Sequence, residues 1–99
     1  MSEDKIHYIT LFAELDSLFK LITYVTVNFF ADRCPPCRAI APHFQSLAAQ
    51  HAVPSVLAFA KVNVNHVQDV ARTHRVTAMP TFLFFKDGKQ VAVNGQKMI

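Results

Sequence analysis

An α/β fold with a central mixed sheet is predicted for this chain of 99 residues, and three observations lead to it. Strand-like and helix-like segments alternate along most of the sequence, which is typical of a parallel sheet covered by helices. Several strand-like segments are continuously apolar, as expected for strands buried on both faces. A turn signal, KDGK at residues 86–89, follows the last of these segments and predicts an added antiparallel hairpin. The length predicts one domain, covering residues 1–99.

The N-terminal third predicts a strand, a helix and a second strand. Ile6–Ile9 is a short strand candidate. Apolar residues recur at helical spacing through residues 11–20, and Thr10 is the expected N-cap of that helix. Residues 22–30 are dense in β-branched and aromatic side chains without alternation, so we expect a strand buried in the middle of the sheet.

The middle third predicts the longest helix and another strand. Residues 35–51 place Ile40, Phe44 and Leu47 on one side of a helix, and Pro42 lies inside it. Residues 56–63 form the next buried strand candidate.

The C-terminal third predicts a short helix followed by extended segments. The helix is expected at residues 67–74 and a third buried strand at residues 81–85. After the turn at residues 86–89, residues 90–93 return as an edge strand, and residues 96–99 form a further extended piece. The predicted order is therefore β-α-β-α-β-α-β-β, in which the alternation implies a parallel core and the final hairpin adds antiparallel edges.

Composition excludes several classes of protein. The formal net charge is +3, but the Lys and Arg residues are scattered, so we expect no nucleic-acid partner. No apolar stretch approaches the roughly 20 residues of a membrane span, and the polar residues 1–5 are unlike a signal peptide. Two cysteines do not make a disulfide scaffold, so a reducing compartment is expected, cytoplasmic and also nuclear.

Those two cysteines carry the chemistry. Cys34 and Cys37 flank Pro35 and Pro36, directly after the strand candidate at residues 22–30 and at the start of the long helix. A thiol at a helix N-terminus feels the positive end of the helix dipole, which favours the reactive thiolate. Two buried inert thiols or half of a zinc site are the alternatives. A zinc site needs four ligands and no second pair of cysteines exists, so we favour a redox pair and expect no metal and no cofactor.

Two segments resemble the thioredoxin family. Residues 29–44 read FFADRCPPCRAIAPHF and resemble its active-site segment; residues 78–89 read AMPTFLFFKDGK and resemble its substrate-facing loop and hairpin. The resemblance covers nearly the whole chain. It implies a three-layer fold with helices on both faces of the sheet, and a protein-disulfide reductase active in electron transport and cell redox homeostasis. It also implies disulfide-containing protein substrates and an electron donor of the thioredoxin reductase type.

The resemblance assigns roles to individual residues. Cys34 would attack a substrate disulfide, and Cys37, more deeply buried, would resolve the mixed disulfide. Met79-Pro80 would be a cis peptide bond that leaves the Met79 backbone free to pair with a substrate segment. Substrate contacts are expected at these positions and around the cysteines, at Arg33, Pro35, Pro36, Met79 and Pro80.

Three residues depart from the family pattern. Pro35 replaces the usual Gly, and we expect a modest shift toward a stronger oxidant. Arg33 replaces the usual Trp, which removes part of the docking surface and adds a charge that favours acidic partners. Asn28 replaces a buried Asp that relays protons, and an amide does not titrate at neutral pH. Resolution by Cys37 is therefore expected to be slow, and Asn28 itself is expected to be a buried amide satisfied by hydrogen bonds.

The sequence also stops at Ile99, before the family's last helix. We therefore expect apolar surface at Phe82, Phe84 or Phe85 to be exposed, and a homodimer to form through the uncovered sheet face. A second function stays open on these grounds, a redox-impaired binding or chaperone module that holds partners through Met79 and the same face.

Overall fold

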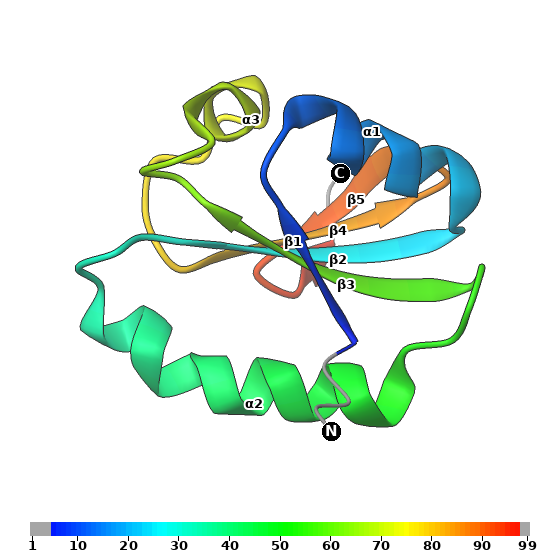
Figure 1. Ribbon diagram of the computed structural model, residues 1–99, viewed down its shortest axis with the longest axis horizontal. Helices are drawn as coiled ribbons and strands as arrows, with labels where there is room; N and C mark the ends of the chain where they lie inside the picture. Colours follow the sequence, from blue (N-terminus) through cyan, green and yellow to red (C-terminus); the bar gives the residue numbers. More distant parts are fainter. Residues whose placement is uncertain (1–4, 98–99) are drawn as a thin grey trace.

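The computed structural model describes residues 5–97, and it shows a six-stranded mixed sheet with helices on both faces (Figure 1). The strand order is β1-β3-β2-β4-β5-β6. The parallel part consists of β1 (Ile6–Ile9), β2 (Tyr24–Phe30) and β3 (Leu57–Asn63). The antiparallel part consists of β4 (Thr81–Lys86), which pairs with β2, and of β5 (Lys89–Val93) and β6 (Gln96–Lys97).

Three helices complete the three layers. The long α2 (Pro35–His51) lies on one face of the sheet, and α1 (Phe12–Leu21) and α3 (Gln68–Thr73) lie on the other (Figure 1). The predicted α/β class, element order and mixed sheet are confirmed, and each boundary agrees within two residues. Of the last extended piece, Gln96–Lys97 forms β6, and Met98 and Ile99 lie outside the described residues.

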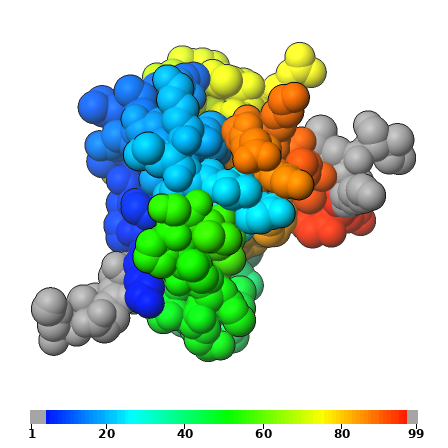
Figure 2. Space-filling view, turned by 90° about the vertical axis from the view of Figure 1, so that its right-hand side faces the viewer, coloured from blue at the N-terminus to red at the C-terminus, as the bar shows by residue number. Residues whose placement is uncertain are grey.

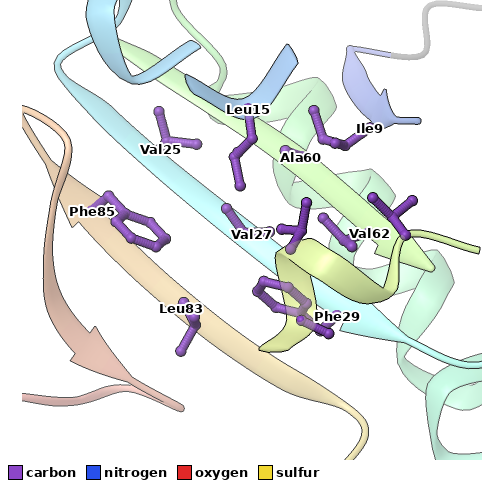
Figure 3. Close-up of a cluster of buried hydrophobic side chains, with 12 residues drawn as sticks. Ile9, Leu15, Val25, Val27, Phe29, Ala60, Val62, Leu83 and Phe85 are labelled. Atoms are coloured by element: carbon purple, nitrogen blue, oxygen red, sulfur yellow. The ribbon is translucent and has the colours of Figure 1, made fainter. Parts of the chain in front are cut away.

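The larger core fills the space between the sheet and the α1/α3 layer. Alternate residues of the central strand, Val25, Val27 and Phe29, point into it and are almost fully buried (Figure 3). Leu15 of α1 and Val70 of α3 close the cluster from the helix side. Continuous apolar sequence in β2 is explained by this placement, because the strand has a neighbour on each edge and a helix layer on each face.

A smaller core lies beneath α2. It contains Ile6, Phe44, Ala48 and Phe59, and the ring centroids of Phe44 and Phe59 are 5.5 Å apart. Phe82 packs against this cluster while remaining half-buried. Within residues 5–97, α2 is the one helix that lies over this face of the sheet (Figure 1).

The expected exposure of β4 is wrong at one position. Phe85 is only 3% exposed, and its ring lies 4.4 Å from that of Phe19 on α1. Strand alternation explains the result, because Leu83 and Phe85 point to the α1/α3 side, whereas Phe82 and Phe84 point to the α2 side and are half-buried.

The predicted cap of α1 is also wrong. The N-cap is Leu11, and Thr10 does not cap the helix. Instead, a carboxylate oxygen of Glu14 accepts from the backbone N–H groups of Thr10 (2.6 Å) and Leu11 (3.1 Å) and from the Thr10 hydroxyl (2.9 Å). These hydrogen bonds, the one from the Thr10 backbone foremost, hold the pKa of the Glu14 carboxyl below its usual range.

The β4–β5 turn is fastened to the connection between α1 and β2. The Asp87 N–H donates to the Thr23 carbonyl oxygen at 2.8 Å, and Figure 2 shows the orange hairpin beside the light-blue segment. Asp87 and Gly88 both have positive φ, as a tight two-residue hairpin requires. The hairpin thus fixes β4, the strand that follows the Met79-Pro80 bond.

Candidate active site

The two cysteines lie where β2 gives way to α2. β2 ends at Phe30, and Cys34 is the N-cap of α2 with an extended backbone. Pro35 and Pro36 occupy the first two helical positions, where a backbone N–H has no intrahelical acceptor and a proline is therefore tolerated. This local sequence places the Cys34 sulfur at the positive end of a 17-residue helix.

Cys34 and Cys37 form a disulfide with an S–S distance of 2.08 Å and a Cα–Cα distance of 5.2 Å. The Cys37 backbone N–H also donates to the Cys34 sulfur, at a distance of 3.2 Å. The same N–H is available to a Cys34 thiolate once the disulfide is reduced. The pair can therefore be oxidised and reduced between neighbouring positions, with a backbone donor directed at the first sulfur.

Both cysteines are buried to the same degree in this oxidised form. Cys34 is 6% exposed and Cys37 is 5% exposed, so the expected difference between them is not seen. The S–S bond joins the first sulfur to Cys37 in the first turn of α2. Around the pair, the predicted contact residues Arg33, Pro35 and Pro36 are exposed.

The second predicted segment lies at the same end of the sheet. Met79-Pro80 is a cis peptide bond, as expected. Thr81, the next residue, pairs with Phe29 across the β2–β4 ladder, which brings the bond to the end of β2 that leads into Cys34. Met79 is half-buried, and within residues 5–97 its backbone N–H and carbonyl have no hydrogen-bond partner. This free backbone is what β-strand addition of an extended peptide uses.

Asn28 contradicts one expectation. Its side chain is fully buried in β2, but neither amide atom finds a hydrogen-bond partner in the described part of the chain. Its strand neighbours on the two sides are Lys61 and Phe82. The predicted satisfied amide is therefore an unsatisfied one, because these neighbours leave both its donor and its acceptor without a partner.

A polar network beside the cysteines was not predicted from the sequence. The Asp32 N–H donates to Asn65 Oδ1 at 2.8 Å, and Asn63 Nδ2 donates to Asp32 Oδ1 at 2.7 Å. His66 Nε2 lies 3.6 Å from Asp32 Oδ2, and Arg38 Nη1 donates to the Asp32 carbonyl oxygen at 3.4 Å. The network joins the segment before Cys34 to the β3–α3 connection.

His74, the C-cap of α3, is half-buried. Its ring lies among three phenylalanine rings, with centroid distances of 6.4 Å to Phe19, 6.3 Å to Phe29 and 5.4 Å to Phe85. Burial lowers the pKa of His74 below its usual range, and the charge of Asp16 opposes part of that shift. The sequence marks where α3 ends and so could have placed His74 at its C-cap. The sequence does not show the aromatic surroundings of His74, because the three rings come from other elements.

No three His, Cys, Asp or Glu side chains within residues 5–97 come together as metal ligands would. None of the helices in that range combines the length and apolar character that crossing a bilayer demands.

Comparison with known proteins places this geometry among relatives. Residues 13–98 match the family model described as Thioredoxin. A "Thioredoxin-like protein" of Fusarium culmorum is 63% identical over 94 residues, covering 95% of this chain and 78% of the relative. A "Thioredoxin" of Neurospora crassa is 52% identical over 96 residues, covering 97% and 76%. Among solved structures, a mutant thioredoxin from Halobacterium salinarum has a TM-score of 0.83 at 31% identity, covering 100% of this chain and 84% of that one.

Proposed function

Because this chain belongs to the thioredoxin family and is a thiol-disulfide oxidoreductase, we propose that it reduces disulfides in partner proteins, with Cys34 as the attacking residue. One observation carries the assignment: the Cys34 sulfur lies at the N-cap of α2, is bonded to Cys37, and accepts from the Cys37 N–H at 3.2 Å. A thiolate formed there gains a hydrogen bond and the field of the helix.

The Cys34–Cys37 dithiol supplies both electrons that reduction of one substrate disulfide requires. In the dithiol form, the Cys34 thiolate attacks one sulfur of the substrate disulfide, and the other substrate sulfur leaves as a thiolate. The Cys37 thiolate then attacks the Cys34 sulfur, which forms the Cys34–Cys37 bond and releases the second substrate thiolate. Two electrons pass to the substrate and the enzyme is left as the disulfide seen here.

Thioredoxins act on disulfide substrates and are reduced by thioredoxin reductase. We assign the same kind of donor to this protein, a flavoprotein reductase that returns two electrons to Cys34 and Cys37. A reducing compartment, the cytoplasm and also the nucleus, suits a chain whose only two cysteines must cycle back to thiols.

The substrate contacts follow from the surface around the disulfide. The free backbone groups of Met79 would pair with an extended segment of the substrate, with Pro80 beside it. The exposed Pro35 and Pro36 would form the apolar floor next to the sulfur. The exposed Arg33 would add positive charge, so that acidic segments around the substrate disulfide are favoured.

Reduction of insulin disulfides tests the proposal. The wild-type protein, recycled by dithiothreitol or by NADPH with a thioredoxin reductase, should precipitate insulin chains well above the background rate. Cys34→Ser should fall to background, because the remaining thiol of Cys37 lies inside the helix rather than at its N-cap. Cys37→Ser should accumulate a mixed disulfide between Cys34 and the substrate, because the second step is missing.

A binding module is the second candidate, and the untitratable, unpartnered Asn28 favours it because no acidic side chain among residues 5–97 is buried where it could assist Cys37. If Cys34→Ser reduces insulin as fast as the wild type, and partner binding survives substitution of both cysteines, the reductase assignment is lost and the binding module takes its place.

We further propose that two copies pair through the groove between α2 and the sheet. This α2 groove holds about 340 Å³ and its lining includes Ile40, Phe44, Leu47, Phe59, Phe82 and Phe84. Leu47 is 48% exposed, and Phe82 and Phe84 are half-buried. Apolar surface of this kind is stabilised when a partner covers it.

A further inference from the structure

Asp32 lies two residues before Cys34, and three of its four polar groups make hydrogen bonds. Its N–H donates to Asn65, its carbonyl oxygen accepts from Arg38, and one carboxylate oxygen accepts from Asn63, while His66 lies 3.6 Å from the other. The side chain is nevertheless 55% exposed. An exposed carboxylate needs no protein partner for its solvation, so these three hydrogen bonds indicate that the position of this segment is fixed.

The partners are themselves fixed to the sheet. Asn63 is the last residue of β3, and its side-chain oxygen accepts from the Asn65 backbone N–H at 2.9 Å, which orients the Asn63 amide. The Asn63 carbonyl oxygen accepts from the N–H groups of His66 (3.0 Å) and Val67 (2.9 Å). Asp32 therefore binds to a short, internally bonded loop that extends directly from a central strand.

The network also reaches the first turn of α2. Arg38 donates through its backbone N–H to the Cys34 carbonyl oxygen at 3.1 Å and through its guanidinium to the Asp32 carbonyl oxygen. The segment between β2 and α2 is thus held at its start by the β3–α3 connection and at its end by the helix. Cys34 lies between the two attachments.

We propose that Asn63 and Asn65 are positioning residues for the reactive cysteine, acting through Asp32. By fixing Asp32, they keep the Cys34 sulfur over the N-terminus of α2, where the Cys37 N–H stabilises the thiolate. Loss of either amide lets the segment move, weakens that hydrogen bond in the thiolate form, and makes Cys34 harder to ionise.

A second interpretation predicts little change in the ionisation of Cys34 when Asn65 is replaced. If Asp32 acts only as a negative charge near Cys34, Asn65 matters little, because its amide oxygen accepts from the Asp32 backbone N–H and does not touch the carboxylate. Asn65→Ala therefore separates positioning from electrostatics, whereas Asn63→Ala also removes a hydrogen bond to the carboxylate. This inference concerns the same site as the proposed function, but thiolate formation is measured without any substrate.

The test uses Asn65→Ala and Asn63→Ala in a Cys37→Ser background, where Cys34 is the only thiol and the backbone donor of residue 37 is kept. The rate of alkylation by iodoacetamide is followed against pH on folded protein. We expect each asparagine variant to raise the midpoint by about half a pH unit toward the ~8.5 of a free thiol. Gln50→Ala is the matched control, since Gln50 is an exposed amide bonded only to Ser46 near the far end of α2; its midpoint should equal that of the parent.

Unchanged midpoints in the two asparagine variants, or an equal rise in Gln50→Ala, would overturn the inference. If one asparagine variant fails to fold, the other decides the outcome. The insulin assay stands apart from this result: a wild type that reduces insulin with unmoved midpoints loses only the positioning role. A wild type inactive on insulin, with raised midpoints in the variants, loses only the reductase function.

Discussion

Asn28 is a residue whose burial lowers the stability of the folded state. A buried amide that makes no hydrogen bond gives up its hydration without compensation, at roughly 1–3 kcal/mol. Asn28 is 0% exposed, and neither of its amide atoms has a partner among residues 5–97. Its neighbours in β2 are apolar and almost fully buried. The fold therefore tolerates a polar group at a position where packing alone would select an apolar one.

Asn28→Val should stabilise the protein. Valine removes both unsatisfied atoms and favours the strand conformation, so we expect the free energy of unfolding to rise by about 1–3 kcal/mol. Urea unfolding at pH 7 measures it, with an unchanged slope as evidence that the compactness of the two states is the same. Asn28→Ala is the matched control and should gain less, because it leaves a cavity. A Val variant less stable than the wild type would mean that the amide is satisfied by bound water.

At the scale of elements, the short helix α3 is followed by a titratable ring that packs against three other elements. The helix itself spans only Gln68–Thr73, and His74 follows as its C-cap. The His74 ring contacts α1 through Phe19, β2 through Phe29 and β4 through Phe85. A neutral imidazole suits this aromatic environment, and a protonated one does not, which is why burial lowers the pKa of His74.

The pH dependence of stability should report on this contact. Because the pKa of His74 is lower in the folded state, the unfolded chain binds the proton more tightly. The contribution of the neutral His74 ring to the free energy of unfolding is fully present above the pKa of about 6.5 that a histidine has in the unfolded chain. It is lost as the pH falls toward the lower pKa of His74 in the folded state. The urea midpoint of the wild type should fall as the pH is lowered from 7.5 to 5. In His74→Gln this fall should be smaller. His7→Gln, a substitution at an exposed position, is the control and should show the same fall as the wild type. Staying above pH 5 keeps the Glu14 carboxyl, whose pKa is lowered, out of the measurement. An identical slope in His74→Gln would contradict the assignment.

The helices and strands also show how much of the structure could be predicted from the sequence. Apolar runs and turn residues predicted each helix and strand to within two residues, because burial on both faces leaves a direct mark on composition. The two cysteines and Met79-Pro80 were predicted because they belong to recognisable segments. The Asp32 network was not predicted. Its hydrogen bonds to Asn63 and Asn65 span sequence separations of 31 and 33 positions, and no local pattern in the sequence marks such a pairing. The unsatisfied Asn28 was missed for the same reason, because satisfaction depends on neighbours from other strands.

At the scale of the whole molecule, the two faces of the sheet are covered unequally. Two helices and the larger core lie on one face, and α2 alone lies on the other (Figure 1). The α2 groove lies on this second face, with Leu47 and the β4 rings of Phe82 and Phe84 along it, and neither cysteine belongs to its lining. Pairing of two copies through this surface would leave Cys34 available to substrates.

Leu47→Glu should therefore prevent self-association without loss of reductase activity. A carboxylate at this position would have to be desolvated in the dimer, whereas in the monomer it stays in water, since Leu47 is 48% exposed. Size-exclusion chromatography with light scattering at 10–200 µM (roughly the range in which weak interfaces are populated) should show the wild type shifting to a dimer and Leu47→Glu remaining monomeric. Leu21→Glu, at a residue 73% exposed on α1, is the matched control and should dimerise as the wild type does. A wild type that stays monomeric throughout this range, or a control that loses the dimer equally, would show that the α2 groove does not join two copies of this chain.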